Sequence, residues 1–252
     1  MHAHAQLALG LDPRPMQPLT LTHLRDLLLP VHGPQRDAAR LDPVTQLVLA
    51  ILSARTRDEV ALAALGRLAR CYGSWDALAD AEPGGIETIL LPVTHAYPKA
   101  RQLPRALRMV RARSGRLDLG FLADLPVALA LRWLMALPGV GMRNAATVLN
   151  FSTLRGRAFS IDTHVLRIGC RLGLFPPGAD IERAYAIAMD QVPDAWTADD
   201  LYELHWLMKL HGQSTCTFDG PACAACVLKG FCYPSPARPR PASSPGCADV
   251  TA

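Results

Sequence analysis

Lysine is scarce in this chain of 252 residues. Its 26 basic residues include only three lysines, Lys99, Lys209 and Lys229, and the others are arginines. An arginine side chain stays protonated at every pH that a protein tolerates, whereas imine chemistry needs a free amine. The sequence therefore offers few side chains for a mechanism that passes through a Schiff base.

Long apolar runs are also missing. The hydrophobic residues make up 50% of the chain, but no run of about 18 apolar residues is free of charge, as a membrane-spanning helix requires. The N-terminal residues show no basic segment followed by a long apolar core, which a secretory signal would have. We therefore expect a cytoplasmic protein with no membrane partner, associated with the nucleoid if it binds DNA.

The length and the charge balance set loose limits on the fold and on the partner. A chain of this length forms one or two domains with a sizeable core of their own. The 22 acidic and 26 basic residues give a formal net charge of +4. Such a small positive excess permits an anionic partner without requiring one.

Apolar residues recur at helical spacing along most of the chain, as at Val44, Leu47, Val48 and Ile51. No stretch alternates as a strand would, and proline or glycine turns separate segments of ordinary helix length. The pattern predicts an all-α fold of about ten short helices. Residues 1–19 and 234–252 contain little that a core would bury, and we expect both segments to be disordered.

One turn between two predicted helices has two glycines around a single residue, Gly139-Val140-Gly141. The glycines let the backbone turn tightly and point N–H groups out of the start of the second helix. An anion such as a DNA phosphate binds well there. A glycine-rich corner that only turns the chain explains the same residues equally well.

Asp162 precedes a segment in which Val165, Ile168 and Leu172 recur at helical spacing. The commonest reason for an aspartate at such a position is capping of the helix N-terminus. A carboxylate there also stays ionised, because the helix dipole and backbone N–H groups stabilise its charge. It could then stabilise a positive charge or activate a nucleophile, so both interpretations stay open.

Four of the seven cysteines, Cys216, Cys223, Cys226 and Cys232, lie in one short segment. Without an export signal, such a group indicates a metal or iron–sulfur site rather than a disulfide framework. Four thiolates hold either a zinc ion or a [4Fe–4S] cluster, and the single Cys-x2-Cys pair favours the cluster slightly, since zinc ribbons usually have two. The other three cysteines stand alone, and we expect the site not to need them.

A row of six arginines between Arg101 and Arg116 lies opposite Leu103, Leu107 and Val110 on a predicted helix. Such a row is most often a solvated basic face. On a DNA-binding protein it would instead contact backbone phosphates without regard to sequence.

These motifs, in this order, resemble the endonuclease III family of helix-hairpin-helix DNA glycosylases. The resemblance runs from about Leu41 to Cys232 and includes the segment 52–58, the Leu-Pro-Gly-Val-Gly hairpin, Asp162-Thr163-His164 and residues 210–212. It implies an iron–sulfur domain of residues 20–43 and 164–233, and a six-helix domain of residues 44–163 with the hairpin. The implied partner is double-stranded DNA, bound in a cleft by a monomer with a damaged base flipped out.

The resemblance also assigns roles to individual residues. Asp162 matches the catalytic aspartate, residues 139–141 match the phosphate-binding hairpin, and the four grouped cysteines match the ligands of a [4Fe–4S] cluster. Arg55 lies where many relatives have a glutamine, near the gap that a flipped base leaves. His95 lies in the loop that corresponds to the wedge of the family. That loop matches poorly, and an ordinary surface turn explains it as well.

Bifunctional members of the family place a lysine two residues after the last hairpin glycine, where this chain has Arg143. The lysine attacks the sugar C1′ and permits strand cleavage, whereas a guanidinium presents no free nitrogen. None of the three lysines is near the hairpin in the sequence. The resemblance places Lys99 on the far side of the sugar. It therefore implies a monofunctional base-excision repair glycosylase in which Asp162 and a water hydrolyse the glycosidic bond.

Two other functions stay open. An altered pocket around Arg143 and Arg55 would suit a catalytically weak or inactive homologue that recognises damaged or distorted DNA. A helical interaction module held by zinc would require the hairpin and Asp162 to match by accident. The sequence does not identify the damaged base, because the pocket residues come from loops.

Overall fold

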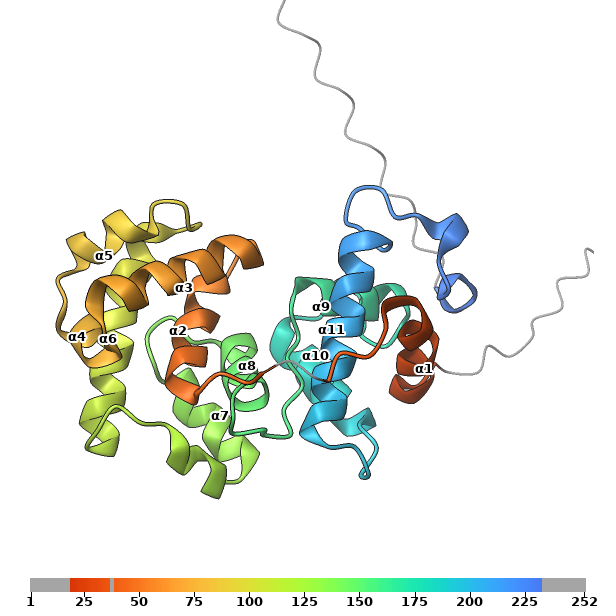
Figure 1. The fold of residues 1–252 in the computed structure, drawn as a ribbon. Helices are drawn as coiled ribbons and strands as arrows, with labels where there is room; N and C mark the ends of the chain where they lie inside the picture. The colour runs from red at the N-terminus through yellow and green to blue at the C-terminus, as the bar shows by residue number, and fades with distance from the viewer. Residues whose placement is uncertain (1–18, 37–38, 233–252) are drawn as a thin grey trace, which may run out of the picture.

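The computed structural model describes residues 19–36 and 39–232, which fold into helices joined by short loops (Figure 1). Apart from Leu19, the two terminal segments that we expected to be disordered lie outside the described residues. Within the described ranges there are eleven α-helices and three short 3₁₀-helices. The only β-type pairing among them is an isolated parallel bridge between Leu41 and Ser152. The prediction of an all-α fold is confirmed.

The α-helices are α1 (Leu21–His32), α2 (Pro43–Ser53), α3 (Asp58–Tyr72), α4 (Trp75–Asp80), α5 (Pro83–Leu90), α6 (Ala96–Ser114), α7 (Val127–Met135), α8 (Met142–Phe151), α9 (Thr163–Arg171), α10 (Ile181–Gln191) and α11 (Ala198–Ser214). The 3₁₀-helices are η1 (Gly120–Asp124), η2 (Cys223–Ala225) and η3 (Lys229–Phe231).

Side chains that accept hydrogen bonds fix the start of several helices. The capping residues are Thr20, Asp42, Ser74, Asp162, Asp180 and Thr197, which begin α1, α2, α4, α9, α10 and α11. Each accepts an N–H of the first turn that has no partner within its helix. Short polar residues in front of apolar repeats thus determine where the chain enters its helices.

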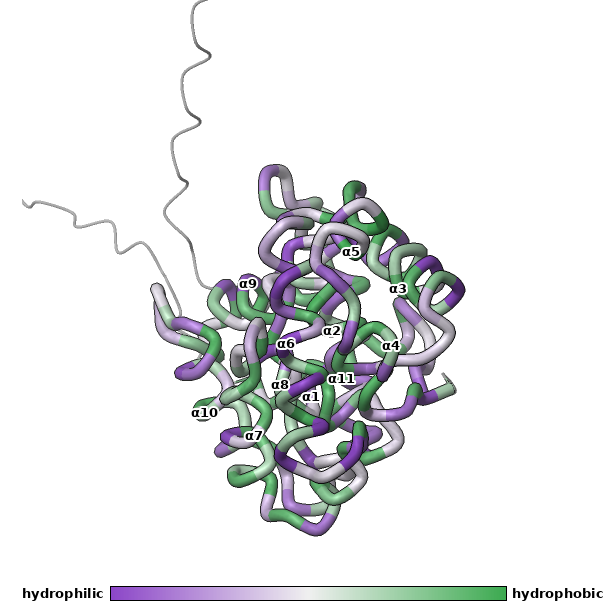
Figure 2. The backbone as a smooth tube through the Cα atoms, turned by 90° about the vertical axis from the view of Figure 1, so that its left-hand side faces the viewer, coloured by the Kyte–Doolittle hydropathy of each residue, from purple (hydrophilic) through white to green (hydrophobic). Residues whose placement is uncertain are grey.

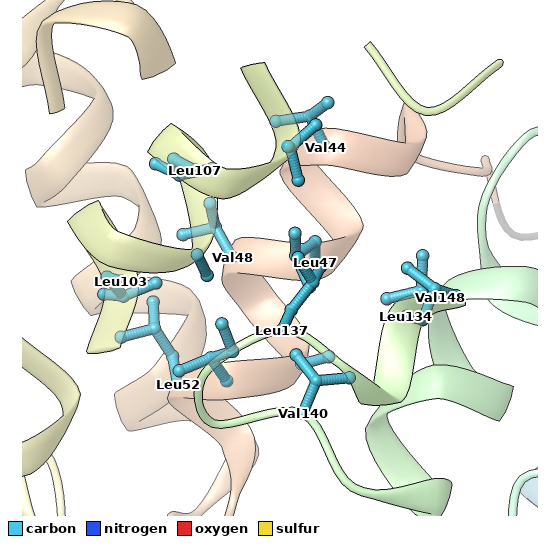
Figure 3. Packing of buried hydrophobic residues seen from close by; sticks show 14 of the residues in the cluster. Val44, Leu47, Val48, Leu52, Leu103, Leu107, Leu134, Leu137, Val140 and Val148 are labelled. Carbon is cyan, nitrogen blue, oxygen red and sulfur yellow. The ribbon is translucent and has the colours of Figure 1, made fainter. Parts of the chain in front are cut away.

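The first hydrophobic core is built by α2 to α8, and α2 runs through its middle (Figure 3). Leu47 and Val48 of α2 are fully buried, and Leu103 of α6 approaches the same helix from another side. Leu137 and Val140 from the hairpin between α7 and α8 also belong to this core. The hairpin is therefore anchored by its apolar residues, which leaves its glycines at the edge of the core.

A second core gathers α1, α9, α10 and α11, on the opposite side of the molecule from α2 to α6 (Figure 1). It includes Leu24 and Leu28 of α1, Phe159 before α9, and Leu204 of α11. Residues of the first core lie between Val44 and Ala158, whereas the second core takes residues from both ends of the described chain. The exact domain boundaries that we proposed from the sequence stay a prediction.

The chain passes between the two cores twice, and the two passages are bonded to each other. Thr153 N donates to Leu41 O at 2.9 Å beside the Leu41–Ser152 bridge. The amide of Asn150 at the end of α8 donates to Ala198 O at 2.8 Å, which ties α8 to the start of α11. The guanidinium of Arg157 donates to the carbonyls of residues 193 and 196. Hydrogen bonds as well as covalent links thus join the cores.

No helix in the described part of the chain combines the length and the apolar composition that crossing a membrane demands. Hydrophobic and hydrophilic residues instead alternate within the helices, as the colours along the tube in Figure 2 show. Each helix therefore has one face for a core and another for solvent.

Candidate active site and cysteine group

Asp162 caps α9 and is almost completely buried. Its Oδ1 accepts the N–H groups of His164 at 2.8 Å and Val165 at 2.9 Å, so the capping interpretation is correct. The second carboxylate oxygen, Oδ2, has no hydrogen bond with a described residue and faces His205 Nε2 at 3.9 Å. The cap therefore uses one oxygen and leaves the other for a different partner.

The surroundings of Asp162 keep its carboxyl group ionised. Burial alone would raise the pKa of Asp162, but His205, the N–H of Val165 and the positive charges of Lys209 and Arg143 lower it below its ordinary value. Two of these groups, His205 and Lys209, come from α11. A buried carboxylate with a fixed negative charge can stabilise a positive charge that develops beside it.

His205 is a buried residue of α11 that the sequence analysis did not select. Its Nδ1 lies 2.7 Å from Ser160 O. A carbonyl oxygen only accepts, so Nδ1 carries the proton and Nε2 has a free electron pair. Burial lowers the pKa of His205 to about 4, so the ring is neutral at pH 7. A lone histidine on an apolar helix face gives no sequence signal that separates this role from a core position.

Lys209 is the second functional candidate that the sequence analysis missed. Its Nζ lies 2.7 Å from Asp58 Oδ2 and 2.9 Å from Asp58 Oδ1, and its charge helps to lower the pKa of Asp162. Lys209 therefore acts on the candidate site from α11, which the sequence did not indicate.

Lys99 lies in α6 and is buried against the end of α2. Its Nζ donates to Leu52 O and Ala54 O at 2.7 Å and to Thr56 Oγ1 at 3.0 Å. Burial and the charge of Arg143 lower the pKa of Lys99 to about 8, so it is nearer to Arg143 than its place in the sequence suggested. Three acceptors use all three N–H groups of the ammonium. Its role is to hold the end of α2.

The loop that Lys99 holds contains Arg55. The backbone of Arg55 has a φ of 55°, in the left-handed region that residues other than glycine seldom adopt. The hydrogen bonds from Lys99 to Ala54 O and Thr56 Oγ1 lie on either side of it. The structure therefore fixes the backbone from which the Arg55 side chain leaves the loop.

The structure accounts for the two hairpin glycines in different ways. Gly139 has a φ of 79°, and a Cβ there would lie 2.7 Å from Gln102 Oε1, so this position requires glycine. Gly141 has a φ of −96° and is the N-cap of α8. A Cβ at Gly141 would meet nothing within 4 Å. No described residue would therefore clash with a side chain at Gly141. This is what we expect where a glycine faces a ligand.

Arg143 lies in the first turn of α8, where its charge is felt by several site residues. It helps to lower the pKa values of Lys99, Asp162 and His205. Its Nε is buried and has no hydrogen-bond partner among the described residues. A buried N–H without an acceptor is costly, so Arg143 is placed to donate to a bound group.

His95 is exposed in the loop before α6 and has a φ of 58°. Two large apolar side chains beside it are also exposed, Leu91 at 69% and Tyr97 at 54%. The guanidinium of Arg101 lies over the Tyr97 ring, 4.5 Å from its centroid. The loop therefore exposes apolar surface beside His95, and it makes no described contact with Asp162.

Half of the six arginines between Arg101 and Arg116, five of which lie in α6, are engaged within the protein. Arg108 donates to Ala79 O, Arg111 pairs with Asp76 and Asp80, and Arg116 pairs with Asp118. These contacts occupy three of the six side chains. A continuous phosphate-binding stripe along this helix is therefore not available in the described structure.

The four grouped cysteines follow α11. Burial first, and then the neighbouring cysteines, raise the pKa values of the Cys226 and Cys232 thiols. Arg171 Nη1 lies 3.1 Å from Cys216 Sγ, and His211 Nε2 lies 3.4 Å from Cys226 Sγ. Among the described residues, no three His, Cys, Asp or Glu side chains meet closely enough to hold a single metal ion. The group therefore has two nitrogen donors beside its sulfurs, one from Arg171 and one from His211.

A close helix contact joins the cysteine group to the aspartate. Gly212 of α11 packs on α9, where a Cβ would lie 2.8 Å from His164 Nδ1. Arg167 donates to Gly212 O and to Cys216 O. The segment that carries the cysteines is therefore held against the helix that Asp162 begins.

Together, the all-α fold, the hairpin at the start of α8 and the buried aspartate at the start of α9 define a helix-hairpin-helix protein of the DNA glycosylase type. The chain is 27% identical over 190 residues to endonuclease III of Escherichia coli K12, covering 75% of this chain and 83% of that protein. It is 29% identical over 197 residues to endonuclease III of Thermotoga maritima, covering 78% and 85%. The chain is thus similar to endonuclease III along about three quarters of its length.

Solved structures agree on the fold. A trapped covalent intermediate of endonuclease III with DNA aligns with a TM-score of 0.71 at 22% identity, covering 85% of this chain and 96% of that chain. A thermostable thymine-DNA glycosylase aligns with a TM-score of 0.64 at 17% identity, covering 84% and 93%. No family model matches the chain. The homologues support a base-excision DNA glycosylase of the helix-hairpin-helix type.

Proposed function

We propose that this protein is a monofunctional DNA glycosylase of base excision repair. It hydrolyses the N-glycosidic bond of a damaged base that is flipped out of double-stranded DNA, and it leaves the strand intact. The observation that carries the proposal is the buried carboxylate of Asp162, which is ionised and has one oxygen without a hydrogen bond to a described residue.

Asp162 acts by charge. As the bond between the sugar C1′ and the base nitrogen lengthens, positive charge develops on the sugar, and a buried anion lowers the energy of that transition state. A water then adds to C1′, and the departing base takes up a proton. Burial strengthens the effect because little water screens the carboxylate.

The contacts of the two lysines nearest to Arg143 and Asp162 support hydrolysis without strand cleavage. Arg143 occupies the position of the lysine in bifunctional relatives, and a guanidinium does not form an imine. Lys99 donates three hydrogen bonds, and Lys209 pairs with Asp58. A Schiff base on either amine would first require these contacts to break.

DNA binding rests on residues at the edges of the two cores. The N–H groups at Gly141, at the start of α8, suit a backbone phosphate. Arg55 extends from its fixed loop toward the gap that the flipped base leaves, and His95 with its apolar neighbours acts as the wedge. Contacts with phosphate make the affinity fall as salt is raised. Such an enzyme acts as a monomer on chromosomal DNA in the cytoplasm.

The four grouped cysteines suit a [4Fe–4S] cluster. Four thiolates would supply its ligands, and Arg171 and His211 would donate hydrogen bonds to two of the sulfurs. The cluster would tie the segment after α11 to the second core, so its contribution is to the fold rather than to the chemistry at Asp162.

A damage-binding homologue without catalysis is the second candidate. The observation that favours it is the unpaired, buried Nε of Arg143 near Asp162. A guanidinium there would bind a carbonyl or phosphate oxygen well and would disfavour positive charge on the sugar. Such a protein would bind lesion duplexes tightly and release no base.

A glycosylase assay over a panel of lesion duplexes separates the two candidates. We expect base release from at least one lesion, detected as strand breaks only after alkali treatment. Asp162→Asn removes the charge at nearly constant shape, so it should lower single-turnover base release by at least about 100-fold while affinity for the duplex stays within about twofold. Base release that is undiminished in this variant contradicts the role of Asp162.

A further inference from the structure

Asp162 Oδ2 and His205 Nε2 face each other across 3.9 Å, and both are hydrogen-bond acceptors. The carboxylate is ionised, and the histidine has its only proton on Nδ1, because Nδ1 donates to Ser160 O at 2.7 Å. Two acceptors gain nothing from facing each other in a buried place, and 3.9 Å is too long for a direct hydrogen bond. The arrangement lacks a donor between them.

The His205 ring is held firmly in this orientation. Ser160 O fixes it on one side, and Phe151 meets it edge to face with ring centroids 4.9 Å apart. The residue is only 3% exposed, and Asp162 is 4% exposed. The two free electron pairs therefore point into a fixed and shielded space instead of moving with solvent.

We propose that His205 is a catalytic residue that, with Asp162, holds the water that attacks C1′. This inference rests on the proposed function. A water has two O–H groups, and it can donate one to each acceptor. With hydrogen bonds of about 2.8 Å, the two acceptors of one water lie about 4 to 4.5 Å apart. The observed separation is close to that value, and a small adjustment of either side chain completes the geometry.

The chemistry of this water is balanced without another reagent. The bond from C1′ to the base nitrogen breaks first and its electron pair leaves with the base, and the water oxygen then forms a bond to the positively charged C1′. One proton of the water passes to His205 Nε2 and the other stays on the new hydroxyl group. His205 then loses its proton to solvent, and the base gains one.

The charged groups around the pair agree with this assignment. Asp162 favours a proton on His205, whereas Lys209 from α11 and Arg143 from α8 disfavour one, and burial disfavours it most. His205 therefore stays neutral at pH 7 and keeps Nε2 free to accept a hydrogen bond. Lys209 is itself held by Asp58, so it does not compete for the water.

Two variants of His205 distinguish the roles of its two ring nitrogens. His205→Asn keeps a donor for Ser160 O near the position of Nδ1 but removes the acceptor toward Asp162. His205→Gln keeps an acceptor near the position of Nε2 but loses the bond to Ser160 O. His23→Asn, at an exposed residue of α1, is the matched control for the same substitution.

The kinetic test uses single-turnover base release together with affinity for a duplex that contains a cationic pyrrolidine in place of the sugar. We expect His205→Asn to slow base release by about 100-fold and His205→Gln by about 10-fold. Affinity for the cationic duplex should stay within about twofold in both, because Asp162 supplies the charge. Full activity in His205→Asn, or equal losses of rate and of cationic-duplex affinity, overturns the proposal.

A second measurement does not depend on activity. The ¹⁵N chemical shifts of His205 at pH 7 report which nitrogen carries the proton, and we expect Nδ1–H with an unprotonated Nε2. If the wild-type protein releases no base from any lesion, the proposed glycosylase function fails, and the water site is judged on this measurement alone. A proton on Nε2 overturns it, since that nitrogen would then have no electron pair with which to accept a hydrogen bond from the water.

Discussion

Lys209 Nζ lies 2.7 Å from Asp58 Oδ2, which joins α11 of the second core to the first residue of α3 in the first. The pair is largely buried on the lysine side, with side-chain exposures of 9% for Lys209 and 35% for Asp58. Removing the lysine leaves a carboxylate that water reaches only in part.

We therefore expect Lys209→Met to lower the free energy of unfolding by about 1–2 kcal/mol. Urea denaturation measures this, and Lys229→Met, at an exposed lysine with no ion pair among the described residues, is the control. Equal free energies of unfolding in the two variants would show that the ion pair does not stabilise the fold. Because Lys209 also lowers the pKa of Asp162, the pKa of that carboxyl group should rise in Lys209→Met.

The unmodified protein should not form a covalent adduct with lesion DNA under borohydride. Arg143 cannot supply an imine nitrogen, and both nearby lysines are engaged in hydrogen bonds or an ion pair. Trapping on a gel checks this against a bifunctional relative as positive control. If an adduct does form, its loss in Lys209→Gln or in Lys99→Gln would identify the amine and would contradict monofunctional chemistry.

The sequence indicated the hairpin through Gly139 and Gly141, and the structure gives the two glycines different roles. Gly139→Ala places a Cβ on a residue whose backbone is left-handed, and that Cβ would lie 2.7 Å from Gln102 Oε1. We therefore expect the free energy of unfolding to fall by about 1–3 kcal/mol. Gly141→Ala meets no such contact and should unfold like wild type. It should nevertheless weaken binding to damaged and undamaged duplexes alike, because its methyl group obstructs the phosphate.

Fluorescence anisotropy with both duplexes, beside urea denaturation, measures this pair. A Gly141→Ala variant that changed lesion preference while binding undamaged DNA normally would exclude the phosphate role.

Local patterns explain which parts of the site were predictable. Gly139 and Gly141, Asp162 and the grouped cysteines were selected because turns, helix starts and ligand spacing leave signals within a few residues. The residues around His205 and Lys209 contain no such signal. These two side chains reach Asp162 only because α11 packs beside α9, and that contact depends on the absence of a side chain at Gly212. Helical spacing predicted the all-α class, but it does not state which helix faces meet.

Purified protein should contain about four irons and four sulfides per chain. We expect Cys226→Ser to lose the cluster and to lower stability, because the segment after α11 would lose its ties to the second core. Cys71→Ser is the control, since Cys71 is exposed on α3. Metal analysis, the visible spectrum and thermal unfolding measure these effects. One zinc per chain without sulfide would contradict the cluster.

The stability of the protein should fall as the pH is lowered from about 6.5 to about 4. Burial lowers the pKa of His205 to about 4 from 6.5, so within this window the unfolded chain binds a proton that the folded chain does not. Each pH unit then costs the folded state up to about 1.4 kcal/mol. His205→Asn lacks this group, and its unfolding free energy should depend less on pH. Identical pH dependence in urea denaturation would show that His205 is not neutral and buried in solution.

The two passages between the cores have a mechanical consequence. Because Thr153 N bonds Leu41 O beside the Leu41–Ser152 bridge, the passages lie together and do not act as two independent linkers. A rotation of one core against the other would pivot at these passages, because hinges are short stretches of loop residues. It would have to break the ion pair between Lys209 and Asp58 and the hydrogen bond from Asn150 to Ala198 O. The contacts that hold Lys209 near Asp162 are thus also the contacts that oppose opening of the two cores.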